Sequence, residues 1–440
     1  MSGNGVRRGL VIAAPASGSG KTIVTLALIR LLAREGRTVA SFKTGPDYID
    51  GAFHHAASAG RPCCNLDIFA MRRETLAAAL AYGCDDAELM IVEGAMGLFD
   101  GAANGEGSTA DLAALLRLPV VLVIDAARQS QSVAALTHGF RSFRQDVTIA
   151  GLILNRVAST RHETLLRNAL APLQLPVLAA LPPEGDLALP SRHLGLVQAQ
   201  ERTGLDFFLD GAADWLHRHL DRTALEQVLQ PPQPPPAQSF APLPPLGQHI
   251  AIARDDAFAF AYAHLLQGWR EQGAALSFFS PLADEAPAAA ADAVFLPGGY
   301  PELQAGRLAG NARLLQGLRD AAARGAAIYG ECGGYMLLGQ GLTDADGVPH
   351  RMAGLLPVAT SFAQRRRHLG YRCIVALADT PLGPAGSRFR GHEFHYSTQS
   401  ETGAAAPLFR ASDAEGNDLG PLGAQAGRVF GSYLHLIDRE

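Results

Sequence analysis

The sequence predicts an α/β protein of two domains, each built on a largely parallel sheet flanked by helices. The chain has 440 residues, more than a single hydrophobic core usually serves. Hydrophobic residues make up 48% and charged residues 18%, a composition typical of globular proteins. A proline-dense stretch at 231–245 separates two regions in which short apolar runs alternate with helical segments.

The N-terminal region, 1–228, predicts a doubly wound parallel sheet. Its apolar runs lack in/out alternation, as expected of parallel strands buried on both faces. Helical stretches such as Thr22–Arg34 and Leu165–Leu170 fall between them. Ligands of such sheets bind beyond the C-terminal ends of the strands. The expected strands are Leu10–Ala14, Thr38–Lys43, Leu89–Glu93, Val120–Ile124, Ile149–Leu154 and Val177–Ala180.

Residues 229–247 are interpreted as a linker, because dense proline favours a stiff polyproline II spacer. A ligand for an aromatic-lined module is the alternative, but globular patterning resumes at once on both sides. The C-terminal region, 248–440, repeats the alternation of strands and helices, and its later strands are expected to be partly antiparallel. The expected strands are Ile250–Ala253, Val294–Leu296, Ala327–Tyr329, Leu355–Ser361, Tyr371–Ala376, Arg388–His395 and Arg428–His435.

Charge and cysteine content exclude several classes of protein. The formal net charge of −5 shows no basic excess, which argues against nucleic acid as the main partner. No apolar run reaches membrane-spanning length, and the run after Arg8 leads straight into a glycine-rich loop, so it predicts a strand rather than a signal peptide. Five cysteines without metal-finger spacing indicate a reduced, cytoplasmic setting without disulfides.

A glycine-rich loop, Ala14-Pro-Ala-Ser-Gly-Ser-Gly-Lys-Thr22, follows the first expected strand and opens a helix. Such a loop holds phosphate through backbone N–H groups and the helix dipole, with a lysine to neutralise charge and a hydroxyl for Mg²⁺. Pro15 stands where the standard spacing has glycine, so the loop is a variant; a structural turn is the alternative. Asn155 ends another strand and either reads the nucleotide base or serves a turn. The expected ATP-binding residues are Ser17, Gly18, Ser19, Gly20, Lys21, Thr22 and Asn155.

Carboxylates follow the second and third expected strands, at the same edge of the sheet. In the stretch 43–50, Asp47 or Asp50 can reach Mg²⁺ or substrate, or can cap the next helix. Glu93 ends the third strand in a place typical of a Mg²⁺-binding carboxylate, and the glycines after it permit close approach of a ligand. The expected metal ligands are Thr22, Asp47 and Glu93, and the expected substrate contacts are Asp47, Tyr48 and Asp100.

Cys332 lies where a β-branched and aromatic run breaks into small residues, which predicts a strand, a sharp turn and a helix. A nucleophilic thiol needs this placement. Gly298, Gly299 and Gly333 offer N–H groups for an oxyanion, and His435, expected at the end of a strand, offers a base. A buried inert cysteine and a structural histidine are the alternatives. Zinc is not expected at His392–His395, because a strand places the two histidines on opposite faces.

Together these motifs resemble the cobyrinate/hydrogenobyrinate a,c-diamide synthase family over nearly the whole chain, a dethiobiotin-synthetase-like P-loop ATPase fused to a class I glutamine amidotransferase. The resemblance implies ATP and Mg²⁺ as cofactors and L-glutamine and a corrinoid macrocycle as substrates, and it leaves a homodimer open. It implies that ammonia released by Cys332 and His435 amidates the a and c acetates as acyl phosphates. The matching segments are Ser17–Thr22, Gly45–Asp50, Glu93–Gly101, Gly330–Tyr335, Gly391–Ser397 and Tyr433–His435.

One departure and several alternatives accompany the resemblance. Class I amidotransferases usually place a glutamate two residues after the catalytic histidine, where this chain has Ile437 with Asp438 beside it. The third triad member is therefore missing or supplied otherwise. Cobyric acid synthase and nickel-sirohydrochlorin a,c-diamide synthase are related alternatives. A P-loop partitioning or scaffold ATPase with an inactive glutaminase-like module is an alternative of another class, against which an intact cysteine–histidine pair weighs.

Overall fold

The computed structural model describes residues 8–440 except 188–190, 193–194, 197, 237–241 and 402. The chain divides into two compact units. The first holds residues up to 238 without 70–72, and the second holds 70–72 together with 239–440. The division therefore falls inside the segment expected as a linker, 229–247.

The described ends of the proline-rich segment pack onto the units they adjoin. Gln230 and Gly9 exchange two backbone hydrogen bonds, of 2.7 and 3.1 Å, within the first unit. In the second unit Leu243 and Leu246 are buried. These two ends are therefore packed against their units and do not form a free spacer. Residues 237–241, where a polyproline helix was also expected, lie outside the described residues.

A seven-stranded sheet forms the centre of the first unit, in the order β3-β2-β4-β1-β5-β6-β7, with parallel pairing throughout. Each expected strand is present within one or two residues; β3 was not expected, because Cys-Cys-Asn-Leu is too short and polar to read as a buried run. The strands are β1 (Arg8–Ala13), β2 (Val39–Thr44), β3 (Cys63–Leu66), β4 (Leu89–Glu93), β5 (Val120–Asp125), β6 (Ile149–Asn155) and β7 (Val177–Leu181), with a small pair β8 (Ser191–Arg192) and β9 (Gly195–Leu196).

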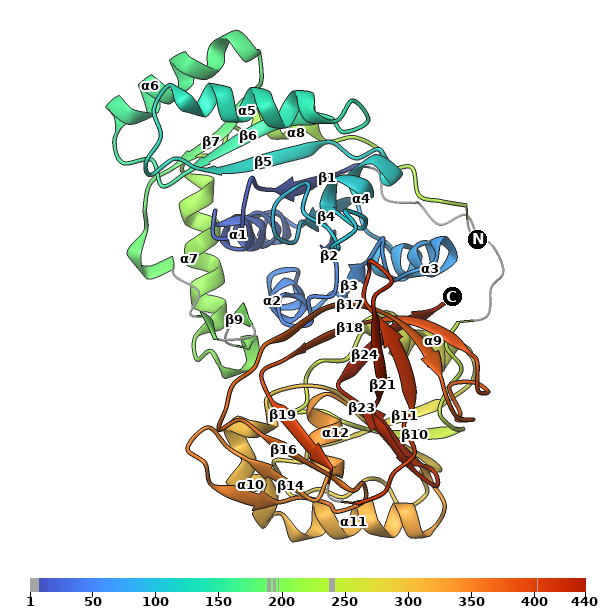
Figure 1. The fold of residues 1–440 in the computed structure, drawn as a ribbon. Helices are drawn as coiled ribbons and strands as arrows, with labels where there is room; N and C mark the ends of the chain where they lie inside the picture. The colour runs from blue at the N-terminus through green and yellow to red at the C-terminus, as the bar shows by residue number, and fades with distance from the viewer. Residues whose placement is uncertain (1–7, 188–190, 193–194, 197, 237–241, 402) are drawn as a thin grey trace. The chain divides into compact units, whose positions relative to one another are not determined.

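Helices cover both faces of this sheet, α1 and α7 on one and α5 and α6 on the other (Figure 1). The register brings strand ends together: Lys43 of β2 and Ile12 of β1 both lie beside Glu93 of β4. Loops after these three strands therefore share one edge. The helices are α1 (Lys21–Arg34), α2 (Asp50–Ala57), α3 (Arg73–Gly83), α4 (Thr109–Leu116), α5 (Ser132–Phe143), α6 (Thr160–Leu170), α7 (Leu205–His217) and α8 (Arg222–Val228), with 3₁₀ turns at Ala171–Leu173, Gly185–Leu187 and Ala199–Glu201.

The second unit contains a six-stranded sheet in the order β11-β10-β12-β13-β23-β22, parallel except for the edge strand β22. Its strands are β10 (His249–Ala253), β11 (Ala275–Phe279), β12 (Ala293–Leu296), β13 (Ala327–Glu331), β22 (Ala424–Ala426) and β23 (Val429–Ser432). The helices of the unit are α9 (Ala263–Glu271), α10 (Ala305–Gly310), α11 (Ala312–Ala323) and α12 (Gly333–Leu338), with a 3₁₀ turn at Pro301–Gln304.

Two further sheets complete the second unit. A five-stranded antiparallel sheet has the order β21-β20-β17-β18-β24, and a four-stranded mixed sheet the order β15-β14-β16-β19. The strands are β14 (Gly341–Thr343), β15 (Pro349–Arg351), β16 (Val358–Ser361), β17 (His368–Ala376), β18 (Arg388–His395), β19 (Thr398–Glu401), β20 (Phe409–Ser412), β21 (Asp418–Leu422) and β24 (Leu434–Arg439).

The expected single strand Arg428–His435 is wrong: the chain forms two strands there. β23 runs parallel to β13 in the six-stranded sheet, while β24 pairs with β18 in the antiparallel sheet. The chain changes sheets at Tyr433, so His435 is the second residue of β24 rather than the end of a strand. The local residue pattern does not record such a change of sheet, because it depends on which distant strands pair with each half of the segment.

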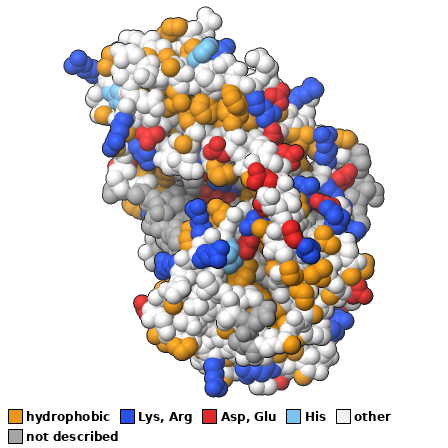
Figure 2. All heavy atoms as spheres, viewed as in Figure 1, with side chains coloured by type: hydrophobic (Ala, Val, Ile, Leu, Met, Phe, Trp, Pro, Cys, Tyr) orange, Lys and Arg blue, Asp and Glu red, His pale blue; other side chains and the backbone are white. Residues whose placement is uncertain are grey.

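The surface agrees with the modest net charge of −5. Among the described residues on the face drawn in Figure 2, basic and acidic side chains are interspersed. Within the described ranges, no helix combines the length and apolarity needed to span a bilayer.

Candidate active sites

The loop between β1 and α1 has the backbone of a phosphate cradle. Gly18 and Gly20 adopt left-handed φ values of 80° and 92°, a region that favours glycine. A Cβ at Gly20 would lie 2.2 Å from Nδ2 of Asn155, so no side chain fits there. Asn155 donates that amide to the Ser19 carbonyl at 2.9 Å and braces the loop. The exposed loop tip, with Ser17 and Gly18, leads into the N-terminus of α1, where N–H groups and the helix dipole attract phosphate.

Lys21, the first residue of α1, is buried beside the loop that follows β4. Its Nζ donates to the Met96 carbonyl at 2.7 Å. Burial lowers the pKa of Lys21, and the charge of Lys43 adds to this. Asp100, expected as a substrate contact, is exposed and accepts the Gly97 N–H at 2.8 Å, so it shapes this turn.

Three oxygen donors converge near the end of β4. Thr22 Oγ1 donates to Glu93 Oε1 at 2.6 Å and lies 3.5 Å from Asp50 Oδ2. The Lys43 ammonium bonds the same two carboxylates, at 2.5 Å to Asp50 and 2.8 Å to Glu93. The two carboxylates already hold one cation, and hard oxygen donors are what Mg²⁺ prefers, so the carboxylates and the Thr22 hydroxyl fit Mg²⁺.

The sequence left open which of Asp47 and Asp50 caps the next helix and which reaches Mg²⁺ or substrate, and in the structure the two residues differ. Asp47 Oδ1 accepts the N–H groups of Ile49 and Asp50, both at 3.0 Å, and so caps the start of α2. The structure therefore places Asp50, and not the expected Asp47, beside Thr22 and Glu93. Burial and the charge of Asp47 raise the pKa of Asp50 to about 7 although Lys43 opposes this. Tyr48, the other expected substrate contact, is half-buried in the same loop.

Sequence reasoning assigned no role to Lys43 or His54, which complete this cluster. His54 Nε2 lies 2.8 Å from Glu93 Oε2, and both side chains are fully buried. Burial opposes protonation of His54, but Cys63 and Glu93 outweigh it and raise its pKa to about 10. Burial likewise opposes ionisation of Glu93, yet Lys43 and His54 hold its pKa well below the usual value. The four-residue spacing of Asp50 and His54 on one helix was the available signal.

A cavity of about 290 Å³ adjoins the phosphate loop. Gly20 and Asn155 line it, as does Trp215, whose indole N–H donates to the Pro182 carbonyl at 3.1 Å. The cavity lies next to the phosphate cradle and is lined by aromatic, proline and amide groups, as suits a nucleobase. The remaining lining residues are Ile23, Arg156, Pro183, Glu184, Gly185 and Leu187.

In the second unit, Cys332 stands at a strained turn between β13 and α12. Its φ of 47° and ψ of −104° are unusual for a residue with a side chain, as at the nucleophile elbow of α/β-hydrolases. Its N–H donates to the Ser432 carbonyl at 2.8 Å, which ties the turn to the end of β23. Burial and the charge of Glu302 raise the pKa of the thiol, although the Gly333 N–H opposes this.

Gly298 brings the thiol and the imidazole together. A Cβ at Gly298 would lie 2.3 Å from Cε1 of His435 and 3.3 Å from Cβ of Cys332, so both side chains lie against its backbone. A Cβ at Gly333 would lie 3.1 Å from the Gly299 nitrogen. The three glycines expected around an oxyanion thus crowd the cysteine turn. Burial, with His392 and His395, lowers the pKa of His435 to about 3 against the opposing charge of Glu393, so the ring is neutral and can accept a proton.

A cluster of His368, Glu393 and His395 lies near this site. His395 bonds Glu393 at 3.0 Å through Nε2 and Ser397 at 3.0 Å through Nδ1, and Arg372 bonds Glu393 at 2.8 Å. The His368 and His395 rings stack at 4.6 Å with 5° between their planes. Parallel rings hold their lone pairs in two separate planes, so they cannot both point at one ion. The cluster is a hydrogen-bonded network rather than a metal site.

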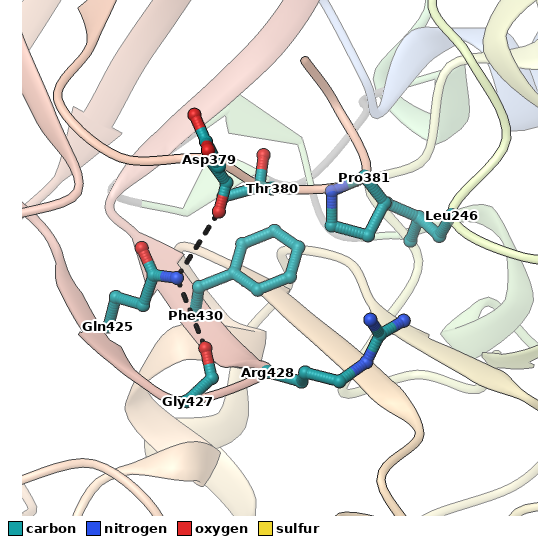
Figure 3. A pocket seen from close by; sticks show the side chains of 8 residues that line it. All are labelled: Leu246, Asp379, Thr380, Pro381, Gln425, Gly427, Arg428 and Phe430. Carbon is teal, nitrogen blue, oxygen red and sulfur yellow. Dashed lines mark hydrogen bonds between the residues drawn. The ribbon is translucent and has the colours of Figure 1, made fainter. Parts of the chain in front are cut away.

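A further cavity of about 460 Å³ lies elsewhere in the second unit (Figure 3). Arg428 and Phe430 line it at the start of β23, whereas Cys332 follows the end of the parallel strand β13. Figure 3 shows the Gln425 amide between the carbonyl oxygens of Asp379 and Gly427, at 3.4 and 3.1 Å. The cavity therefore opens at the opposite end of the sheet from the thiol.

A phosphate loop with converging carboxylates in one unit, and a cysteine elbow facing a histidine in the other, define a glutamine-dependent, ATP-driven ligase. Residues 10–197 match the CobQ/CobB/MinD/ParA nucleotide binding domain, and residues 249–440 match the CobB/CobQ-like glutamine amidotransferase domain.

Curated relatives named hydrogenobyrinate a,c-diamide synthase match nearly the whole chain. The relative from Brucella anthropi is 57% identical, that from a Sinorhizobium species 55% and that from Rhodobacter capsulatus 52%. Each match covers 98% of this chain and 98% of the relative. The chain belongs to the hydrogenobyrinate a,c-diamide synthase family.

Proposed function

We propose that the protein converts the a and c acetate side chains of hydrogenobyrinic acid into amides, with ATP and glutamine, in cobalamin biosynthesis. One observation carries the proposal: both half-sites are present in a chain that matches relatives named for this reaction over 98% of its length. Hydrogenobyrinate is preferred to cobyrinate because of those names. The two macrocycles differ at the ring centre, away from the reacting carboxylates.

In the ATP-binding unit, the phosphate loop would hold the β- and γ-phosphates and Lys21 would offset the charge that develops on transfer. An acetate oxygen attacks the γ-phosphorus and ADP leaves, which gives an acyl phosphate. Ammonia then attacks the acyl carbon, loses a proton, and expels phosphate to leave the amide. Thr22, Asp50 and Glu93 would hold Mg²⁺, which supplies further charge neutralisation at the phosphates.

In the second unit, the Cys332 sulfur would attack the side-chain amide carbon of glutamine as His435 takes the thiol proton. The oxyanion would face the N–H groups of Gly298, Gly299 and Gly333. His435 then returns the proton to the departing ammonia, and water hydrolyses the thioester to glutamate. The raised pKa of the thiol and the lowered pKa of His435 keep the proton on sulfur in the resting enzyme.

Mass spectrometry of the macrocycle tests this assignment. Hydrogenobyrinic acid and cobyrinic acid are incubated separately with enzyme, ATP, Mg²⁺ and glutamine. Two successive decreases of about one mass unit, as each acid becomes an amide, are expected with hydrogenobyrinic acid. No change with either macrocycle would overturn the proposal, and amidation beyond two groups would indicate a cobyric acid synthase instead.

We also propose that the enzyme works in the cytoplasm, as a monomer or a homodimer. The five cysteines are free thiols in the structure, in keeping with a cytoplasmic enzyme. Light scattering of the purified protein would distinguish a monomer from a homodimer.

A further inference from the structure

The amidotransferase histidine lacks the usual carboxylate two residues later in the chain. That position is Ile437, a buried apolar residue. Asp438 follows and is paired with Arg390 of β18. Its two carboxylate oxygens accept hydrogen bonds of 2.7–3.1 Å from Arg72, in the short segment that groups with this unit. Asp438 is therefore committed elsewhere.

Another carboxylate faces the imidazole from the cysteine turn itself. Glu331 immediately precedes Cys332, is 1% exposed, and places Oε2 3.8 Å from Nδ1 of His435. Its other oxygen, Oε1, accepts the Tyr329 hydroxyl at 2.9 Å and the Leu436 N–H at 3.0 Å. The carboxyl group is thus anchored by β13 and β24 while Oε2 points at the ring.

The packing of the imidazole gives its two nitrogens different neighbours. Nδ1 faces Glu331, whereas Cε1 and Nε2 face Gly298, at 2.3 and 3.1 Å from the position that a Cβ there would occupy. Cys332 lies against the same glycine. A carboxylate therefore lies on the Nδ1 side of the ring, while Nε2 faces the glycine against which Cys332 packs, as a general base for the thiol needs.

We propose that Glu331 orients His435 in place of the carboxylate that other class I amidotransferases carry after the histidine. The inference rests on the proposed function, in which Cys332 and His435 release ammonia from glutamine. An approach of about 0.6 Å brings the pair from 3.8 Å to ordinary hydrogen-bond distance. An Nδ1–H donated to Glu331 leaves the Nε2 lone pair for the thiol proton, and the carboxylate then stabilises the imidazolium.

The sequence around the cysteine is consistent with this role. A charged residue is rarely buried without a hydrogen-bonding or charged partner. A fully buried glutamate directly before a nucleophile is therefore expected to have such a partner nearby. Burial raises the pKa of Glu331 to about 8, although the Leu436 N–H and the Tyr329 hydroxyl oppose this. Assays at about pH 8.5 therefore compare variants with the mostly ionised carboxylate.

The test compares glutamine-dependent and ammonia-dependent amidation by the full-length enzyme and three variants. Glu331→Gln keeps the shape and the acceptor oxygen but removes the charge. It should lower kcat with glutamine about 10- to 100-fold, which is part of the rate enhancement that a well-positioned general base supplies. The KM for glutamine should stay within about twofold. Ammonia-dependent amidation should stay within about twofold. The control Asp438→Asn, whose carboxylate is bonded to Arg72, should keep glutamine-dependent kcat within about threefold.

A double variant separates positioning from general destabilisation. In a His435→Asn background, Glu331→Gln should cost less than about twofold, because there is no imidazole left to orient. The same loss in both backgrounds, or an equal loss with ammonia, would overturn the inference. If His435→Asn itself keeps full glutamine use, the proposed cysteine–histidine site fails instead. Should Glu331→Gln not fold, Tyr329→Phe removes one anchor of Oε1 and should lower glutamine-dependent kcat alone by about two- to tenfold; an unchanged kcat would count against the proposal.

Discussion

Replacing Gly298 with alanine should disable glutamine use while leaving ATP-dependent chemistry intact. The new Cβ would lie 2.3 Å from Cε1 of His435, where ordinary contacts begin at 3.4 Å. Since the obstacle is a fully buried ring with Glu331 beside its Nδ1 edge, the imidazole must be displaced by about 1 Å. The backbone of Gly298 lies outside the left-handed region, so the effect comes from the clash alone.

A misplacement of about 1 Å at a catalytic group costs about 100-fold in rate, which is the expected loss in kcat with glutamine. Overpacking should also cost about 1–3 kcal/mol of unfolding free energy. Glutamate release measures the loss of kcat with glutamine, and thermal unfolding measures the loss of stability. Amidation with free ammonia measures whether the ATP-binding unit still works.

Gly310→Ala is the matched control, because a Cβ at this helical position meets nothing within 4 Å. It should leave glutamine-dependent kcat within about twofold and stabilise α10 slightly. Glutamine-dependent kcat within about threefold of wild type for Gly298→Ala would refute the reasoning, since it would show that the working imidazole does not lie against Gly298.

Three further predictions follow from the two half-sites. Cys332→Ala should abolish glutamine-dependent amidation but retain it with free ammonia; loss of both would contradict two separate sites. Asp50→Asn should raise the Mg²⁺ concentration needed for half-maximal ATP turnover about 10- to 100-fold, whereas Asp47→Ala should mainly cost about 1 kcal/mol of stability through the lost helix cap; equal Mg²⁺ effects would contradict the division of roles. Burial opposes ionisation of Glu393, but its histidine and arginine partners outweigh it and lower its pKa to about 2. The ordinary pKa of a glutamate is 4.5, so this group should contribute about 3 kcal/mol of unfolding free energy above pH 4.5 and lose it as the pH falls towards 2. Acid unfolding of Glu393→Gln over that range should show a shallower loss; an unchanged slope would refute the assignment.

Both candidate sites could be predicted from local sequence. The phosphate loop and the cysteine turn each occupy a few consecutive residues, and their glycines carry a backbone requirement that is visible without the fold, as the positive φ of Gly18 and Gly20 bears out. The buried parallel strands could also be predicted from the sequence, because their apolar runs are continuous.

What sequence reasoning missed depends on contacts between distant segments. The change of sheet at Tyr433 is set by the neighbours of β23 and β24, β13 and β18, which lie far away in the chain. The burial of Lys43 and His54 around Glu93 follows from the register of β2 with β4 and from the packing of α2, neither of which a local pattern records.

The residue types and spacing of the sequence by themselves determined the class of chemistry: a phosphate site, a thiol nucleophile and carboxylates at shared strand ends. Only the tertiary structure decided which carboxylate caps a helix and which lies beside Thr22. Asp47 and Asp50 are three residues apart, and the point at which α2 begins turns one into a cap and the other toward Thr22. From the sequence, Glu331 is only the residue before Cys332. In the structure, β24 places Nδ1 of His435 3.8 Å from its carboxylate. Side-chain chemistry is local, but the partner that gives a charged group its role is supplied by the fold.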